Sequence, residues 1–277
     1  MVKHQRKREQ GLQNVSQITL KTNLSSTGWQ KKYSWQRPEK IFQNKPYKVI
    51  MSGLRTTDVK QRVLGDCWFC CALSALAEHP RRLSRIIISE DNQKNGCYCV
   101  ALFVMGKWEA VILDDQFPYN NYSKKPAFTS SLEEELWVLL AEKALAKVYG
   151  GYAMLFSGYA YEALQMISGA PSMTYTTKTN SADQLFEIIQ DAEMNDFVMA
   201  CSTLTKPDLA KLYKMKQQKK IMGLAGSHAY SLIGYEELVE KGGRYELAGG
   251  GDRGKRHTLK LMKIRNPWAS SEYTGKW

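Results

Sequence analysis

Histidines and long apolar runs are both scarce in this sequence. Four of the 277 residues are histidine, so a site that needs an imidazole has few candidates. No segment approaches the roughly 18 consecutive apolar residues of a membrane-spanning helix. The basic start MVKHQRKREQ is not followed by the apolar region of a secretory signal. We therefore expect no stable membrane insertion, and a cytoplasmic protein whose six cysteines are reduced.

Negative charge is scarce near the N-terminus. Residues 1–48 hold eleven lysines and arginines against Glu9 and Glu39, so they contribute +9 to the net charge of +12. The remainder is nearly neutral, which argues against a nucleic-acid-binding surface on the folded part. We interpret residues 1–45 as a basic, solvated arm. We expect no nucleic-acid partner, and at most a weak contact of the arm with acidic surfaces.

Hydrophobic periodicity predicts two helices in the first part of the chain. LGDCWFCCALSALAEHP, residues 64–80, predicts a helix of about three turns with Asp66 at its N-cap. SSLEEELWVLLAEKALAKVYGG predicts a second, amphipathic helix that begins after Ser130 or Ser131 and ends at the glycines. Residues 98–106 and 107–118 predict two strands between these helices.

The pattern changes after about residue 172. DFVMACST, HAYSLIGYEEL and LKLMKIRNPW predict strands, separated by turns rich in glycine and lysine. We therefore expect an α+β fold with a mainly helical part at residues 46–172 and an antiparallel β part at residues 173–277.

The segment GDCWFCC allows three interpretations of its cysteines. A zinc site would join Cys67 and Cys70 to Cys97 and Cys99, but the C-x-C spacing of the second pair is a poor match. A redox C-x-x-C would follow a strand in a βαβ unit, which the surrounding pattern does not predict. The third interpretation makes Cys67 a nucleophile in the first turn of a helix and Cys71, like Cys70, a buried thiol.

A nucleophilic thiol needs a histidine and a group that orients it. Three of the four histidines lie in the tail, at the end of the predicted nucleophile helix and in a basic loop: His4, His79 and His257. His228 instead begins a predicted strand, and the Asn266 amide could hold its ring. Trp268 could shield that hydrogen bond from water. The order Cys, His, Asn favours nucleophilic catalysis.

In these motifs and their order, the chain resembles the protease core of the calpain family of papain-like cysteine peptidases. The resemblance rests on QRVLGDCWF, GSHAYSLIG and KIRNPW, and also on YSWQRPEKI, WEAVILDDQFP and EELWVLLAEKALAKVYGGY. It extends from about Trp35 to Trp277. It implies a papain-like core of two subdomains, truncated at its C-terminal end.

The resemblance implies roles for individual residues. Cys67 would be the nucleophile, His228 the general base and Asn266 the residue that orients it. Gln61 would donate to the oxyanion hole.

The resemblance also implies substrate contacts. Gly158 and Ser227 would contact substrate backbone, and Trp268 would complete the substrate-binding residues.

Calcium is the cofactor that the resemblance implies. The Gly53 carbonyl and the carboxylates of Asp58 and Glu135 would bind it in the first subdomain, since calcium prefers oxygen ligands. Glu272 matches one ligand of a second site whose other ligands would lie beyond Trp277. We expect this second site to be weak or absent.

Three positions depart from the family pattern. Arg62 and Ser227 stand where the family usually has glycine, and Thr56, beside Arg55, stands where it usually has arginine.

The resemblance implies a calcium-dependent cysteine endopeptidase that makes limited cuts in intracellular protein substrates. The alternative is a non-catalytic, calpain-like module that binds or regulates proteins. The intact Gln61, Cys67, His228, Asn266 set favours the enzyme, and the truncation favours the module.

Overall fold

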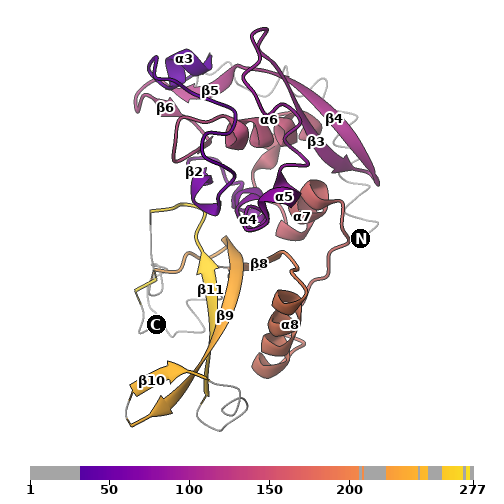
Figure 1. The fold of residues 1–277 in the computed structure, drawn as a ribbon, viewed down its shortest axis with the longest axis vertical. Helices are drawn as coiled ribbons and strands as arrows, with labels where there is room; N and C mark the ends of the chain where they lie inside the picture. The colour runs from indigo at the N-terminus through magenta and orange to yellow at the C-terminus, as the bar shows by residue number, and fades with distance from the viewer. Residues whose placement is uncertain are drawn as a thin grey trace.

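Two subdomains meet along helix α4 (Cys67–Leu76) in the computed structural model (Figure 1). The structure describes residues 32–205, 208, 223–242, 244–248, 258–270 and 273–274. The mixture of helices and antiparallel sheets confirms the predicted α+β, papain-like fold.

The first subdomain surrounds α4 and α6 with three small antiparallel sheets. Its helices are α3 (Pro38–Ile41), α4, α5 (Pro80–Leu83), α6 (Trp137–Tyr149) and α7 (Ala160–Ser168), with 3-10 turns at Thr56–Asp58 and Tyr152–Leu155. Its strands are β1 (Tyr33–Gln36), β2 (Lys60–Gln61), β3 (Cys97–Val104), β4 (Lys107–Asp114), β5 (Phe117–Asn120), β6 (Lys125–Pro126) and β7 (Thr129–Ser130).

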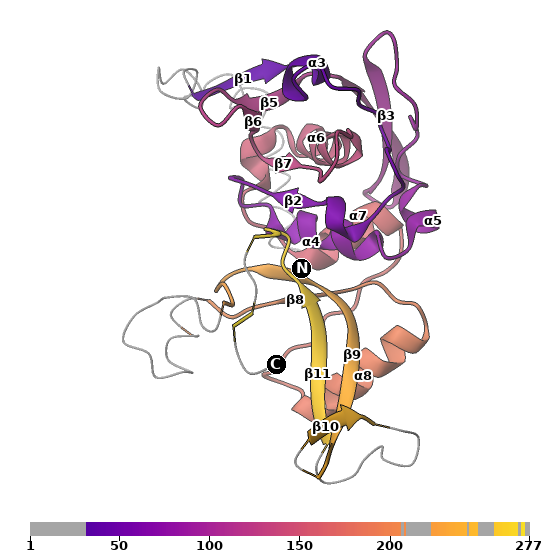
Figure 2. The ribbon, with the colours of Figure 1, turned by 60° about the vertical axis from the view of Figure 1, so that its left-hand side comes forward.

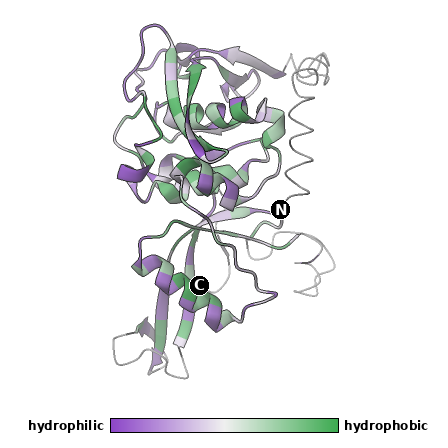
Figure 3. Ribbon diagram, turned by 90° about the vertical axis from the view of Figure 1, so that its right-hand side faces the viewer, coloured by the Kyte–Doolittle hydropathy of each residue, from purple (hydrophilic) through white to green (hydrophobic). Residues whose placement is uncertain are grey.

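The core of the first subdomain lies between α4 and α6. Trp68 and Phe69 of α4 and Trp137 of α6 are at most 1% exposed, and both helices are largely apolar (Figure 3). Burial of such aromatic side chains stabilises a fold by about 3 kcal/mol or more each. The nucleophile candidate Cys67 thus begins a helix that is anchored along its whole length.

In its described residues, the second subdomain is a thin antiparallel sheet with helix α8 packed against it. Its elements are α8 (Ala182–Met194), β8 (Met199–Ser202), β9 (Ala229–Lys241), β10 (Arg244–Leu247) and β11 (Thr258–Arg265). Strand β9 is central, because β8, β10 and β11 all pair with it. Figure 2 shows the long, curved β9 and β11 side by side, with β10 at their far end.

Hydrogen bonds tie the subdomains together at α4 and β2. Ser231 Oγ on β9 donates to the Cys71 carbonyl at 2.8 Å, and this contact is buried. The Gln61 backbone N–H donates to the Pro267 carbonyl, also at 2.8 Å. These bonds set the ends of β9 and β11 against the start of α4.

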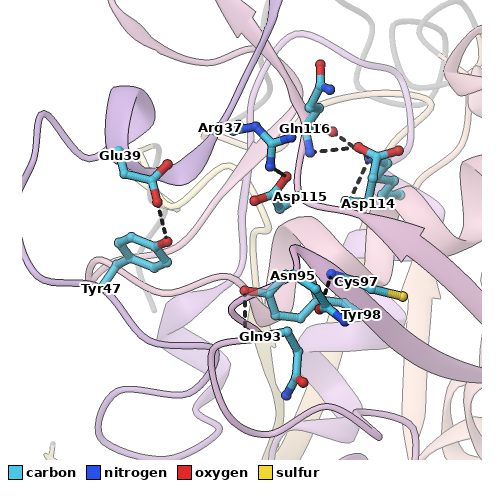
Figure 4. Close-up of polar contacts among 11 residues, drawn as sticks. Arg37, Glu39, Tyr47, Gln93, Asn95, Cys97, Tyr98, Asp114, Asp115 and Gln116 are labelled. Atoms are coloured by element: carbon cyan, nitrogen blue, oxygen red, sulfur yellow. Dashed lines mark hydrogen bonds and ion pairs between the residues drawn. The ribbon is translucent and has the colours of Figure 1, made fainter.

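Part of the predicted basic arm belongs to the fold. Residues 33–36 form β1, which pairs with β5 in the first subdomain. The Arg37 guanidinium forms an ion pair with Asp115, and Tyr47 Oη donates to a Glu39 carboxylate oxygen at 2.7 Å (Figure 4). The arm boundary at residue 45 was therefore wrong, and residues 1–31 lie outside the described part of the chain.

Two helix predictions also need correction. Helix α6 begins at Trp137 rather than after Ser130 or Ser131, because residues 134–137 bond to backbone groups of Lys48 and Val49 instead. Helix α8 was not predicted at all. Its N-terminus carries a capping box in which Ser181 and Gln184 satisfy each other's backbone N–H groups, a signal present in the sequence.

Helix α7 was not predicted either, whereas several predicted strands are confirmed. The β3–β4 hairpin turns at Met105-Gly106, and β8, β9 and β11 form where strands were expected. No helix in the described segments combines the length and apolar character needed to span a bilayer.

Candidate active site

Cys67 is the first residue of α4, with Asp66 at the N-cap position. The helix dipole at this end favours a negative charge on the sulfur. Burial raises the pKa of the Cys67 thiol, the Ala229 backbone N–H opposes that shift, and the Asp66 charge adds to it. The proposed nucleophile therefore depends on a base that removes its proton before the sulfur attacks.

His228 and Asn266 are brought together from the start of β9 and the end of β11. His228 Nε2 lies 2.9 Å from Asn266 Oδ1, which also accepts from the Trp268 backbone N–H at 3.1 Å. Because an amide oxygen only accepts, Nε2 is the protonated ring nitrogen in this arrangement. The Trp268 ring lies 4.3 Å from the imidazole, and the Tyr230 ring lies 4.9 Å away edge-on. The imidazole is thereby held between two aromatic side chains.

One cleft of about 2570 Å³ contains most of the predicted site residues. Six of the predicted residues line it: Gln61, Cys67, Gly158, Ser227, His228 and Trp268. Its walls come from α4, the loop before it and α7 on one side, and from β8, β9 and the end of β11 on the other. The cleft follows the junction of the two subdomains.

The Gln61 amide is engaged with its own loop. Its Nε2 donates to the Leu64 carbonyl at 2.8 Å and lies 3.4 Å from Asp66 Oδ1. Its Oε1 is buried without a hydrogen-bond partner within the described part of the chain. An oxyanion-hole role would require this amide to turn toward the cleft.

A buried carboxyl pair lies beneath the first turn of α4, and it was not predicted from the sequence. Asp66 and Glu142 are at most 3% exposed and lie against each other, and one oxygen of each, Asp66 Oδ2 and Glu142 Oε1, has no hydrogen-bond partner within the described residues. Two buried carboxylates this close repel each other, which favours a proton on one of them. Burial raises the pKa of Asp66 to about 6, and burial with the Asp66 charge raises the pKa of Glu142 well above its ordinary value. Thr129 Oγ1 donates to Glu142 at 2.8 Å, and Cys70 contacts Asp66. The signal for this pair in the sequence was Glu142, the one acid within α6.

The Trp68 indole leaves no room for a side chain at Gly158. A Cβ on Gly158 would overlap the indole of Trp68, whose Nε1 donates to the Leu155 carbonyl at 2.9 Å. A Cβ on Gly65 would similarly lie 2.7 Å from the ring of Phe156. Both glycines allow the 155–158 loop to pack closely on the nucleophile loop, whatever part they take in substrate binding.

Ser227 adopts a backbone conformation that favours glycine. Its φ is 53°, in the left-handed region, and its backbone N–H donates to the Leu204 carbonyl at 2.8 Å. For a residue with a Cβ this conformation costs roughly 1–2 kcal/mol. The strain lies directly before His228 and is held by hydrogen bonds between the flanking segments.

Two predicted calcium ligands are buried near each other in the first subdomain. Asp58 and Glu135 are both 0% exposed, burial raises the pKa of each, and the Asp58 charge raises that of Glu135 further. Asp58 Oδ1 has no hydrogen-bond partner within the described residues, although the Arg55 Nε lies 3.4 Å away. Gly53 is exposed and has a φ of 105°.

This donor set fits a calcium ion. Calcium prefers carboxylate and carbonyl oxygens, and a cation would compensate two buried acids that repel each other. Glu135 currently accepts from the Met51 N–H at 3.1 Å and from Trp137 Nε1 at 3.0 Å, so part of its capacity is already used. No group of three or more acidic, histidine or cysteine side chains suited to a metal occurs among the described residues, so backbone carbonyls would have to contribute.

The other residues singled out in the sequence are four cysteines and Glu272. Cys70 and Cys71 are buried free thiols, as predicted, and burial raises the pKa of both. Cys97 and Cys99 are also free, on β3. Glu272 lies outside the described residues.

A thiol at a helix N-terminus, facing a sheet that carries a paired histidine and asparagine, defines the papain-like class of cysteine peptidase. Comparison with protein families matches residues 13–277 to "Calpain family cysteine protease". The chain belongs to this family.

Curated relatives agree with this assignment. The chain is 29% identical to human "Calpain-9" over 249 residues, which are 88% of this chain and 33% of the relative. It is 31% identical to the bovine "Calpain-2 catalytic subunit" and 32% identical to that of Macaca fascicularis, each over 247 residues that are 88% of this chain and 32% of the relative. The chain thus spans about a third of the length of these relatives.

Proposed function

We propose that this chain is a calcium-dependent cysteine endopeptidase that makes limited cuts in cytoplasmic proteins through Cys67, His228 and Asn266. The observation that carries the proposal is the 2.9 Å contact of His228 with Asn266, at the wall of a cleft that Cys67 also lines. Family membership supports the peptidase class, and the calcium dependence rests on the buried Asp58 and Glu135.

The proposed reaction begins with proton transfer from Cys67 to His228. With Nε2 bonded to Asn266, Nδ1 is the nitrogen that takes the thiol proton. The sulfur attacks the peptide carbonyl carbon, and the negative oxygen is stabilised by the Cys67 backbone N–H and by Gln61 once its amide has turned.

The peptide bond then breaks. His228 gives its proton to the leaving amine, and a thioester remains on Cys67. Water attacks the thioester carbon while His228 takes one of its protons. The C–S bond breaks, and this proton returns to the sulfur, which restores the thiol.

The calcium ion would have a structural part in this proposal. Asp58, Glu135 and the Gly53 carbonyl would hold it, and its charge would offset the repulsion between the two buried carboxylates. These residues lie beside α4, since the turn at residues 56–58 contacts that helix. Binding would favour one arrangement of the loop that precedes Gln61.

Casein cleavage tests the proposal. Cleavage should require calcium and should be lost in Cys67→Ser, because an alcohol is a far weaker nucleophile than a thiolate. Cys70→Ser is the matched control and should retain most activity, since Cys70 faces the core. A parent chain that binds casein and never cuts it would favour the non-catalytic module, with which the engaged Gln61 amide is consistent.

A further inference from the structure

Arg62 follows Gln61 directly and lines the same cleft as Cys67. Its backbone N–H donates to the Phe128 carbonyl at 2.7 Å, and its side-chain Nε donates to Ser130 Oγ at 2.9 Å. These two bonds fix the Arg62 backbone and the Nε edge of its guanidinium. Among the described residues, nothing bonds to its two terminal nitrogens.

The charge of Arg62 is not balanced within the described part of the chain. It forms no ion pair there, and the residue is exposed at the cleft, although neighbouring groups desolvate the guanidinium enough to lower its pKa. An arginine so far above neutrality remains cationic despite such a shift. Because Ser130 already orients the guanidinium, less side-chain freedom is lost when a carboxylate binds it than at a fully mobile arginine.

The wall around Arg62 has little negative charge. Among the described residues that line the cleft, three are arginines, namely Arg62, Arg82 and Arg85, and the one carboxylate is Asp191. The Arg82 guanidinium already donates to the Asp196 carbonyl. Of these three arginines, Arg62 lies nearest in sequence to the proposed nucleophile, five positions before Cys67 on the loop that leads to it.

We infer that Arg62 is a specificity-determining residue that selects peptides with an aspartate or glutamate close to the scissile bond. This inference rests on the proposed peptidase function and names a substrate class for it. The terminal nitrogens of a guanidinium match the two oxygens of a carboxylate, and Ser130 holds Arg62 in a fixed orientation that makes this fit selective.

Peptide binding to the Cys67→Ser chain tests the inference without any turnover. The probes are fluorescein-labelled decapeptides without other charges, in which one aspartate is moved through successive positions. Each has a matched asparagine peptide and a matched lysine peptide. Fluorescence anisotropy in calcium-containing buffer gives the ratio of the aspartate to the asparagine affinity at each position. We expect aspartate to bind about 2- to 5-fold more tightly at one or two positions, and less so at high salt.

Variants of Arg62, made in the same Cys67→Ser chain, separate charge from packing. Arg62→Gln should bring the ratio close to 1, Arg62→Lys should restore part of it, and Arg62→Glu should favour lysine peptides over aspartate ones. Arg81→Gln, at an exposed arginine of α5 outside the cleft, should keep the parent ratio. Ratios near 1 in the parent, binding of neither peptide, or a preference that survives in Arg62→Gln would overturn the inference. A chain that discriminates charge but never cuts casein would instead disprove the proposed function alone.

Discussion

The two subdomains differ in what they bury. Five carboxyl side chains are buried in the first subdomain: Asp58, Asp66, Asp115, Glu135 and Glu142. The described part of the second subdomain buries none, and its buried polar residues are His228 and Ser231. Buried acids are costly unless paired, protonated or bound to a cation. The first subdomain therefore holds the buried acids that respond to protons and cations, while the second positions the His228 imidazole.

The largest expected effect concerns Gln61, at the junction of the two subdomains. Gln61→Ala should lower kcat by roughly 10²- to 10³-fold, or about 3 kcal/mol of transition-state stabilisation, because one oxyanion donor is lost. Steady-state kinetics on a peptide substrate measures this. A variant that loses binding but keeps turnover would assign Gln61 to the cleft wall instead.

Calcium should stabilise the first subdomain specifically. At a calcium concentration of 100 times the Kd, the folded state should gain about 2.7 kcal/mol, because the unfolded chain lacks the site. Differential scanning calorimetry should show this as a rise in Tm that is nearly absent in Asp58→Ala. Titration calorimetry should give about one ion per chain, which reflects the first-subdomain site alone. An unchanged calcium response in Asp58→Ala would remove Asp58 from the ligands.

The buried acid pair should give the first subdomain an unusual pH dependence. The folded-state pKa of Asp66, about 6, lies above its ordinary value of 3.8, so the folded state takes up a proton before the unfolded state does. The contribution of Asp66 to the free energy of unfolding therefore rises as the pH falls through 6. The gain between pH 7 and pH 5 is about 1 kcal/mol.

Urea denaturation of Asp66→Asn at these two pH values checks the prediction. Asparagine keeps the shape and does not titrate, so the gain between pH 7 and pH 5 should be about 1 kcal/mol smaller than in the parent. The groups around Asp66 that also titrate are Glu142, Cys67 and Cys70, and Tyr152 lies near the pair. Equal pH dependence in the two chains would contradict the assignment of this proton.

The smallest expected effect comes from relief of the backbone strain at Ser227 in the second subdomain. Ser227→Gly should raise the free energy of unfolding by about 1 kcal/mol, because glycine adopts a positive φ without steric cost. Ser227→Ala is the matched control and should give no gain, since it removes the hydroxyl and keeps the strain. Thermal unfolding of both variants distinguishes strain from a lost hydroxyl contact.

Local patterns in the sequence predicted the elements that carry the proposed catalytic residues. The apolar spacing in residues 64–80 and the alternation around His228 and Asn266 agree with α4, β9 and β11. The start of α6 could not be predicted locally, because Glu135 lies in a segment bonded to the distant Lys48 instead of in a helical turn. In that case tertiary contacts outweighed a good capping signal.

Site residues that belong to a sequence motif could be predicted. Site residues that only packing brings together could not. Asn266 was expected near His228 from its order in the chain, and the structure places them in contact. The Asp66–Glu142 pair joins residues of two helices that no local pattern connects. The engaged position of the Gln61 amide likewise depends on the folded shape of its loop.

The most direct test of the central claim is covalent labelling of Cys67 by an epoxide inhibitor of papain-like peptidases, located by peptide mass spectrometry. Cys97 is exposed and serves as an internal control for indiscriminate alkylation. If the thiol at the start of α4 is activated by His228, a single label should appear on Cys67, faster with calcium than with chelator, and His228→Ala should abolish it. Labelling of Cys97 in preference to Cys67, or a Cys67 label that ignores both calcium and His228, would contradict the account.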